Sequence, residues 1–363
     1  MRFQCTHCDQ IVSVSNSDLG SVVTCGHCNG QEQVPSQRFS PRVVINDYVI
    51  IKKIGIGRLA SVYLAHQMTL DRKVALKILS QELADDSDFI IDFFKEARSA
   101  GRLNHPNIVQ AYAVNEEDGI YYLVMEYIEG QNLKDIIEEE GSLSCEYSLR
   151  IIHQIAEALA FIWKTHKICH ENIKPENILL TKTKTAKLSD TGLSKASRRL
   201  DSSTPYVSPE KILKSKSDIR ADLYSLGITF YEMLTGITPF EGSKEEIRKQ
   251  HLKTPPPPIN EFRNDVPESY IRIIDKLLAK HPDDRYLSPD GLLSDIKLAR
   301  VAKSEKNIRK AEKQKQKRNH KTTSSKSTFL QISVTLNVVL LVTTLLLMSG
   351  KTQVSVANQV EEI

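Results

Sequence analysis

The stretch VALKIL, residues 74–79, decides how this chain folds. Its branched and apolar side chains predict a strand, and Lys77 is the one cation within it. Gly55 and Gly57 lie upstream of this strand, in the run GIGRLASVY. Two glycines one residue apart allow the backbone to approach a phosphate closely. The glycine pair taken alone also fits a tight hairpin, and a lone lysine also fits a solvated surface charge, so the motifs downstream must decide.

A helix is expected next, over about residues 88–103, with Phe89, Phe93 and Ala100 facing a core and Glu96 among them. The motifs that follow it stand in a fixed order: LNHPNIV at 103–109, YLVMEYIEG at 122–130, CHENIKPEN at 169–177, LSDTG at 188–192, TPYVSPE at 204–210, DLYSLG at 222–227 and HPDDRY at 281–286.

This series resembles that of bacterial serine/threonine protein kinases, over about residues 48–296. The resemblance implies an α+β, bilobal protein kinase-like fold, with ATP and Mg²⁺ between a small β-rich lobe and a large helical lobe. It implies that Lys77 meets the α- and β-phosphates and pairs with Glu96, and that Lys174 contacts the γ-phosphate. Glu210 should pair with Arg285. The remaining residues that it assigns to the nucleotide or to magnesium are Gly55, Gly57, Val62, Ala75, Glu126, Ile128, Asn177 and Asp190.

The catalytic loop departs from the family pattern. The family reads H-R-D, and its Asp accepts the substrate hydroxyl proton. Here the loop reads His170-Glu171-Asn172, and an amide has no basicity near neutral pH. General-base help is worth about 10²–10⁴ in rate, so a comparable loss is expected. Glu171 would also repel a phosphorylated activation loop, which removes the usual mode of activation.

Two smaller departures accompany these. Thr191 replaces the Phe of D-F-G, and Ala60 replaces the third glycine of the phosphate loop. Ser202 and Ser203 remain candidate phosphorylation sites. The sequence therefore favours a pseudokinase that binds Mg-ATP and has weak or no phosphotransfer. An active serine/threonine kinase and a scaffold that binds no nucleotide, whose charges are structural ion pairs only, are the alternatives.

Four cysteines open the chain as two C-x2-C pairs with a longer gap between them: Cys5, Cys8, Cys25 and Cys28. The spacing predicts a structural, tetrahedral Zn²⁺ site with two knuckles, fed by short strands at residues 2–4 and 22–24. Two disulfides or unpaired thiols are the alternatives, but no signal peptide precedes Cys5, which favours a reducing compartment and a metal. His7 and His27 should be exposed turn residues, because four thiolates complete the site.

The composition excludes a wholly disordered or collagen-like chain, with 40% hydrophobic and 26% charged residues. The net charge of +4 hides a block: residues 300–328 carry +9, which leaves −5 for the rest. Residues 329–348 have no charge and are long enough to cross a bilayer as a C-terminal transmembrane helix. A buried soluble helix is the alternative. The basic block precedes this segment and predicts a cytoplasmic kinase-like domain on the inner face of a cell membrane.

The expected domains are a zinc ribbon at 1–34, a linker at 35–47, the kinase-like domain at 48–298, a basic stalk at 299–328, the membrane helix at 329–348 and an external tail at 349–363. The expected partners are ATP, an unidentified cytoplasmic protein and, through the stalk and helix, membrane lipid. Nucleic acid is disfavoured, because the basic block has no interleaved aromatic residues. Asn337 in the middle of the span could bond to a second helix and favour a homodimer.

Overall fold

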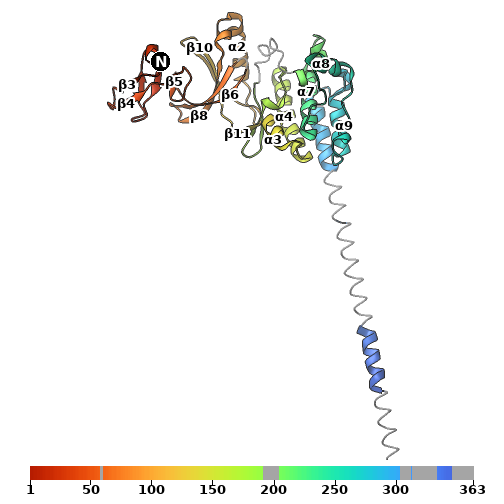
Figure 1. The fold of residues 1–363 in the computed structure, drawn as a ribbon. Coiled ribbons are helices and arrows are strands. Elements are labelled where there is room, and N and C mark those ends of the chain that lie inside the picture. Colours follow the sequence, from red (N-terminus) through yellow and green to blue (C-terminus); the bar gives the residue numbers. More distant parts are fainter. Residues whose placement is uncertain (58–59, 191–203, 303–311, 313–332, 346–363) are drawn as a thin grey trace, which may run out of the picture. The chain divides into compact units, whose positions relative to one another are not determined.

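The computed structural model describes residues 1–57, 60–190, 204–302, 312 and 333–345 of the chain (Figure 1). It forms two units, residues 1–297 and residues 298–363. The first unit contains a small lobe built on a β-sheet and a large lobe built of helices, as the resemblance implied.

The small lobe is an eight-stranded antiparallel sheet in the order β2-β1-β5-β6-β7-β8-β10-β9. Along β8, alternate residues point to opposite faces, as pleating requires. Val74, Leu76 and Ile78 join the core on one face, and Ala75 and Lys77 therefore point to the other. The strands are β1 (Arg2–Gln4), β2 (Ile11–Ser13), β5 (Val43–Ile45), β6 (Tyr48–Ile56), β7 (Ala60–Gln67), β8 (Arg72–Leu79), β9 (Ala111–Glu117) and β10 (Ile120–Glu126).

Helix α2 (Ser87–Ala100) covers the face that Lys77 shares, after the short helix α1 (Gln81–Ala84). Its N-terminal cap is Asp86, whose side chain accepts a hydrogen bond from the backbone N–H of Phe89. Phe89, Phe93 and Ala97 pack against Leu123 of β10. Glu96 lies on this helix, as the sequence predicted, and its side chain is buried.

The large lobe is organised around α7 (Ile219–Thr235), which is buried on nearly all sides. Gly227 permits its close contact with α9 (Glu268–Leu277), because a Cβ there would lie 2.7 Å from the Leu277 side chain. The other helices of this lobe are α3 (Leu133–Glu140), α4 (Cys145–His166), α6 (Pro209–Ile212), α8 (Lys244–Lys253) and a last helix that begins at residue 289 and runs into the second unit, to residue 302. A small sheet, β11 (Gly130–Asn132), β12 (Ile178–Thr181) and β13 (Ala186–Leu188), lies at the junction of the lobes. The 3-10 helices are η1 (Asn16–Asp18), η2 (Pro175–Asn177), η3 (Thr204–Tyr206), η4 (Ile259–Glu261) and η5 (Pro282–Asp284).

The N-terminal segment forms two short hairpins, β1–β2 and β3–β4, where β3 is Val22–Thr24 and β4 is Gln31–Gln33. The two predicted strands at residues 2–4 and 22–24 are confirmed. This segment is not a separate body, because β1 pairs with β5 and β5 pairs with β6. Its strand β1 therefore extends the sheet of the small lobe.

The predicted linker, residues 35–47, needs a correction. Its last part is β5, whose three residues are all buried. Val43, Val44 and Ile45 are branched and apolar, so they favour a strand that is covered on both faces. Phe39 also packs on this core, with its ring 5.7 Å from that of Tyr63.

The second unit contains a helix at residues 333–345, within the predicted membrane segment 329–348. The rest of that segment, most of the stalk and the tail lie outside the described residues. Among the residues that the structure does describe, no helix is both long enough and apolar enough to cross a membrane.

Candidate nucleotide site and four-sulfur cluster

Lys77 lies on β8, an interior strand of the sheet that has β7 on one side and β10 on the other. It lies opposite Val62 of β7 and Leu123 of β10. Its ammonium nitrogen lies 2.6 Å from Oδ1 of Asp190, and their side chains are 12% and 28% exposed. The expected partner was Glu96, but the ion pair that Lys77 forms within the described residues is with Asp190. Asp190 follows β13 (Ala186–Leu188) in the chain, and its side chain meets Lys77 from the large lobe.

Asp190 is held in an unusual backbone conformation, with φ of +59°. Burial alone would raise the pKa of this carboxyl, but the adjacent Lys77 ammonium outweighs it and holds the pKa of Asp190 below its ordinary value. Asp190 is therefore a carboxylate at neutral pH. A carboxylate paired with one lysine can exchange that partner for a hard cation.

A buried histidine and a buried aspartate fix the catalytic loop. Asp222 of α7 accepts the backbone N–H groups of His170 and Glu171, at 2.6 and 2.7 Å. Nδ1 of His170 accepts the N–H of Asn172, so Nε2 carries the proton and donates to the Ser189 carbonyl at 2.9 Å. Burial lowers the pKa of His170, which keeps it neutral in this role. The loop is thus held on one side to α7 and on the other to the residue before Asp190.

Asn177 completes the acidic side of the site from η2. Its side chain N–H donates to the Asn172 carbonyl at 2.8 Å, which leaves Oδ1 without a hydrogen bond among the described residues. The backbone carbonyl of Asn177 accepts from Ser189, next to Asp190. An amide oxygen and a carboxylate so linked are oxygen ligands of the kind that Mg²⁺ prefers. The structure therefore brings together Lys77, Asn172, Asn177 and Asp190.

Lys174 lies three residues before Asn177, at the start of η2. Its ammonium nitrogen is 3.8 Å from Oε1 of Glu176, and the side chain is mostly buried. Glu171 has φ of +68°, and its carbonyl accepts from the Lys211 ammonium at 2.9 Å. The roles of Lys211 and Asp222 were missed in the sequence, although DLYSLG was recognised as a motif. The sequence did contain a signal for Asp222, because it is the acidic residue at the start of DLYSLG, within a mostly apolar helix.

The glycine run forms the turn between β6 and β7. Gly55 lies opposite Val62, and the Gly57 N–H donates to the Ala60 carbonyl at 2.9 Å. A Cβ on Gly57 would lie 3.1 Å from that carbonyl oxygen, so a larger residue would push the turn open. Residues 58–59 at the tip lie outside the described part of the chain, as do Thr191, Ser202 and Ser203.

The expected hinge follows β10. Ala75 lies opposite Met125, and the Glu126 N–H donates to the Gln110 carbonyl at 2.8 Å. The Glu126 carboxylate accepts from the Lys187 ammonium at 2.9 Å. Its side chain is therefore engaged with β13, and only backbone groups of Glu126 and Ile128 would serve an adenine ring.

The ion pair between Glu210 and Arg285 is confirmed. The two guanidinium nitrogens of Arg285 reach the two carboxylate oxygens at 2.8 and 2.9 Å. Both side chains are almost completely buried, and Arg285 also donates to backbone carbonyls of residues 220, 279 and 280. The pair ties the end of the 190–210 segment to the large lobe.

The four N-terminal cysteines meet in one cluster. Their sulfur atoms all lie within 4.8 Å of one another, and the Cys5–Cys28 and Cys8–Cys25 pairs are 3.8 Å apart. A disulfide would need about 2.05 Å, so the structure has four free thiols instead. Four sulfurs about 2.3 Å from a common centre lie about 3.8 Å apart, which is the geometry of a tetrahedral metal site. His7 and His27 are exposed, as expected.

A buried carboxylate that the sequence analysis did not single out supports this cluster. One oxygen of Glu32 accepts from the backbone N–H of Thr6 at 2.7 Å and lies 2.8 Å from Nδ1 of His7. The other oxygen accepts from Arg42 at 2.7 Å, and Arg42 also donates to the Gln33 carbonyl. Burial alone would raise the pKa of Glu32, but these hydrogen bonds hold it well below the ordinary value. Glu32 thus connects the first knuckle to the residue before β5.

A bilobal fold, a strand lysine bound to a carboxylate, and an amide beside that carboxylate define the class of protein kinase-fold proteins. The model of the protein kinase domain family matches residues 48–295 of this chain. The chain therefore belongs to the protein kinase domain family.

Relatives and solved structures agree with this assignment. The chain is 41% identical over 261 residues to the serine/threonine-protein kinase PrkC of Bacillus subtilis, a match that covers 69% of this chain and 40% of the relative. It is 34% identical over 272 residues to PknB of Mycolicibacterium smegmatis, covering 71% and 43%. The crystal structure of the Mycobacterium tuberculosis PknI kinase domain matches with a TM-score of 0.58 and 26% identity, over 70% of this chain and 97% of that one. The chain spans about two fifths of the length of these curated relatives.

Proposed function

We propose that this protein is a membrane-anchored signalling protein of the kinase fold that binds Mg-ATP and transfers phosphate weakly or not at all. Two observations on the same site together support the proposal. Lys77, Asp190 and Asn177 stand together with the polar groups that a nucleotide and its magnesium need. The neighbouring position that should hold the catalytic carboxylate holds Asn172.

Each residue of the site would have its own role in binding Mg-ATP. Asn177 and Asp190 would hold magnesium, and Lys77 would turn from Asp190 to the phosphates when the cation arrives. Bound Mg-ATP would supply a γ-phosphoryl group activated for transfer. Lys174 would neutralise charge near that group. Asn172 can orient a hydroxyl by a hydrogen bond, but it cannot take its proton, so the general-base contribution is absent.

The test uses the full-length chain in detergent. Mg-ATP binding is measured by thermal shift, and transfer from radiolabelled ATP is measured to the chain itself and to a generic protein substrate. We expect a clear Mg-ATP shift that Lys77→Ala removes and that Lys52→Ala, an exposed lysine of β6, leaves unchanged. We expect Asn172→Asp to raise transfer by up to about 10²–10⁴.

An active serine/threonine kinase is the second candidate, and the 41% identity to PrkC favours it. Positioning and metal electrostatics carry much of phosphoryl transfer, so a loop without the carboxylate can retain part of the rate. Robust transfer by the unaltered chain, abolished by Lys77→Ala, would establish this candidate and reject the pseudokinase. Absence of any Mg-ATP shift would leave the nucleotide-independent scaffold.

We propose further that the segment at residues 1–34 is a structural zinc ribbon. The equal 3.8 Å separations of two sulfur pairs and the buried position of Cys5 and Cys25 support the proposal. Four thiolates complete the coordination of Zn²⁺, so no position remains open for catalysis. Zinc content measured on the purified chain should be about one per chain. A value near zero in protein prepared without chelator would reject the ribbon.

We also propose that residues 329–348 anchor the chain in the cell membrane, with the kinase-fold domain in the cytoplasm. The support is the uncharged sequence of this segment and the +9 block before it, which favours a cytoplasmic position and contact with anionic lipid. A protease added outside intact cells should leave the domain uncut. Recovery of the chain in the soluble fraction after lysis would reject the anchor.

A further inference from the structure

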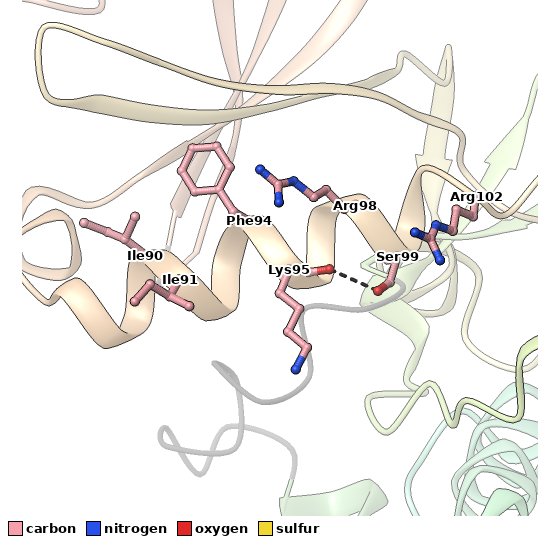
Figure 2. A pocket seen from close by; sticks show the side chains of 7 residues that line it. All are labelled: Ile90, Ile91, Phe94, Lys95, Arg98, Ser99 and Arg102. Carbon is pink, nitrogen blue, oxygen red and sulfur yellow. Dashed lines mark hydrogen bonds between the residues drawn. The ribbon is translucent and has the colours of Figure 1, made fainter.

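The outward side of α2 carries a hollow that the nucleotide site does not use (Figure 2). Its volume is about 650 Å³, within the range of ligand pockets in general. Three apolar residues line it, Ile90, Ile91 and Phe94. Arg98 also lines the hollow, and its position is about 200° around the helix axis from that of Glu96. The buried Glu96 therefore lies on the other side of α2.

The same side of α2 carries a row of cations. Ile91, Lys95, Arg98 and Arg102 recur at intervals of four, three and four residues, so their backbone positions form one stripe along the helix and the turn after it. In Figure 2 the Lys95 side chain extends from one edge of this stripe and that of Arg98 from the other, beside Phe94. Within the described residues, none of the three cations forms an ion pair with a carboxylate. Ile91 is 63% exposed beside them. We call this stripe, together with Ile90 and Phe94, the α2 face.

The stability of the helix does not require this arrangement. Cations in the last turn of a helix complement its dipole, and this accounts for Arg98. It does not account for Arg102, which lies beyond the helix end at Gly101, or for an exposed isoleucine in the row. Asp88 and Asp92 lie nearer the helix N-terminus, so positive charge gathers at the other end.

We propose that the α2 face is a docking site for an acidic segment of a partner protein. The partner's carboxylates would lie along Lys95, Arg98 and Arg102, and an apolar side chain between them would fill the hollow beside Ile91. Charge complementarity selects this occupant, because a row of three cations attracts an anionic surface and repels a basic one. The shape of the hollow favours a peptide over a lipid surface, since a concave site can accept an apolar side chain that projects from a peptide. The proposal does not depend on nucleotide binding.

The experiment measures the binding of fluorescent peptides to the full-length chain in detergent by anisotropy. The first probe carries a Leu-Phe pair between two pairs of glutamates, the second replaces Leu-Phe with Ser-Ser, and the third replaces glutamate with lysine. We expect the first to bind most tightly, with an affinity that falls as salt is raised, and the third not to bind. Failure of the first probe to bind at about 1 mM would overturn the proposal.

The charge variant is Arg98→Glu with Arg102→Glu, and its control is Lys249→Glu with Arg272→Glu on the large lobe. Both carry the same change of net charge at exposed or half-exposed positions. We expect the first to weaken the acidic probe about tenfold or more and the control to leave it within about twofold. Ile91→Ser should weaken the Leu-Phe probe several-fold without altering the Ser-Ser probe. Equal losses in both double variants would overturn the proposal.

A lipid site is separated from a peptide site in the same assay. A short-chain anionic phospholipid below its micelle concentration serves as the second ligand. If the Arg98 and Arg102 reversal removes lipid binding and leaves the acidic peptide bound as before, the α2 face is a lipid site and the proposal fails. The circular dichroism spectrum and the thermal unfolding midpoint of both double variants should match those of the unaltered chain, which shows that they are folded.

Discussion

The N-terminal segment and the large lobe are stabilised in opposite ways. Among residues 1–34 the fully buried side chains are few, namely Phe3, Cys5, Cys25, Glu32 and Val34, and two of them belong to the sulfur cluster. In the large lobe, α7 buries every position from Ile219 to Leu234 except Arg220. A small segment cannot bury enough apolar surface to fold by itself, so it depends on a metal or on a neighbour. The sheet that joins the segment to the small lobe supplies the neighbour, and the proposed zinc would supply the metal.

Removal of one cysteine should have the largest effect. Structural zinc contributes about 10–16 kcal/mol in isolated zinc-finger peptides, so Cys25→Ser or chelation should unfold most of residues 1–34. The free energy of unfolding of the large lobe should change little, because this lobe is stabilised by its apolar core and contains no part of the sulfur cluster. Amide hydrogen exchange would show lost protection in β1 to β4 and retained protection in α7, with Cys145→Ala as the control. Unchanged protection of β3 and β4 after chelation would show that the hairpins stand without a metal.

The next largest effect is expected from the Glu210–Arg285 pair. Arg285→Met leaves a buried carboxylate without its partner, and breaking such a pair costs about 3–5 kcal/mol. Urea unfolding followed by circular dichroism measures the loss, and Arg272→Met at an exposed position of α9 is the control. The double change Glu210→Met with Arg285→Met should recover part of the stability. A loss below about 1 kcal/mol in the single variant would contradict the burial of this pair.

The stability of the large lobe should fall in mild acid because of His251. Burial lowers the pKa of this residue from 6.5 to about 4, and Nδ1 lies 2.9 Å from the Tyr224 hydroxyl. Between pH 6.5 and pH 4 the imidazole of His251 is protonated in the unfolded chain and neutral in the folded chain. The full free energy of unfolding is therefore present above pH 6.5 and decreases as the pH falls through this range. At pH 5 the loss should be about 2 kcal/mol relative to pH 7.

Urea unfolding at several pH values tests this origin of the acid sensitivity. His251→Gln should flatten that part of the pH profile, even if the variant is less stable throughout. His66→Gln, at a more exposed histidine of β7, should leave the profile as it is. An unchanged slope in the His251 variant would assign the effect to other groups.

The smallest effect is expected where the N-terminal segment joins the sheet of the small lobe. Arg42 is only partly buried and binds Glu32 and the Gln33 carbonyl, so Arg42→Met should cost about 1 kcal/mol. The loss should be local, with faster exchange at β1 and β5 and unchanged exchange in α7. Arg38→Met, which removes a bond to the Asp118 carbonyl, is a control at the same junction that does not touch Glu32. Equal loss of protection in α7 would show that the regions unfold together.

Much of this molecule was predictable because its motifs are local. The strand around Lys77, helix α2 with Glu96, and the strands at residues 2–4 and 22–24 follow from short runs of side chains. The Glu210–Arg285 pair was expected from the family pattern, although its two members lie far apart in the chain.

The rest depends on long-range contacts that no local pattern encodes. Three apolar residues at 43–45 indicate a strand, but not that one edge pairs with β1 and the other with β6. The sequence motifs pair Lys77 with Glu96, whereas its ion pair with Asp190 joins residues that are 113 positions apart in the chain. Glu32 looks like a surface acid in sequence, because its burial depends on Arg42 and Thr6 reaching it from other segments.

The continuity of the sheet through β5 also bears on self-association. A strand with unpaired N–H and C=O groups at the edge of a sheet attracts another strand, and β5 is entirely apolar. Strand β1 covers that edge, so the outermost strand becomes β2, which is short and half exposed. At the far edge, β9 ends in Glu116 and Glu117. The β1–β2 hairpin, whose connection carries Cys5 and Cys8, therefore covers the apolar edge of β5 and disfavours β-pairing between molecules.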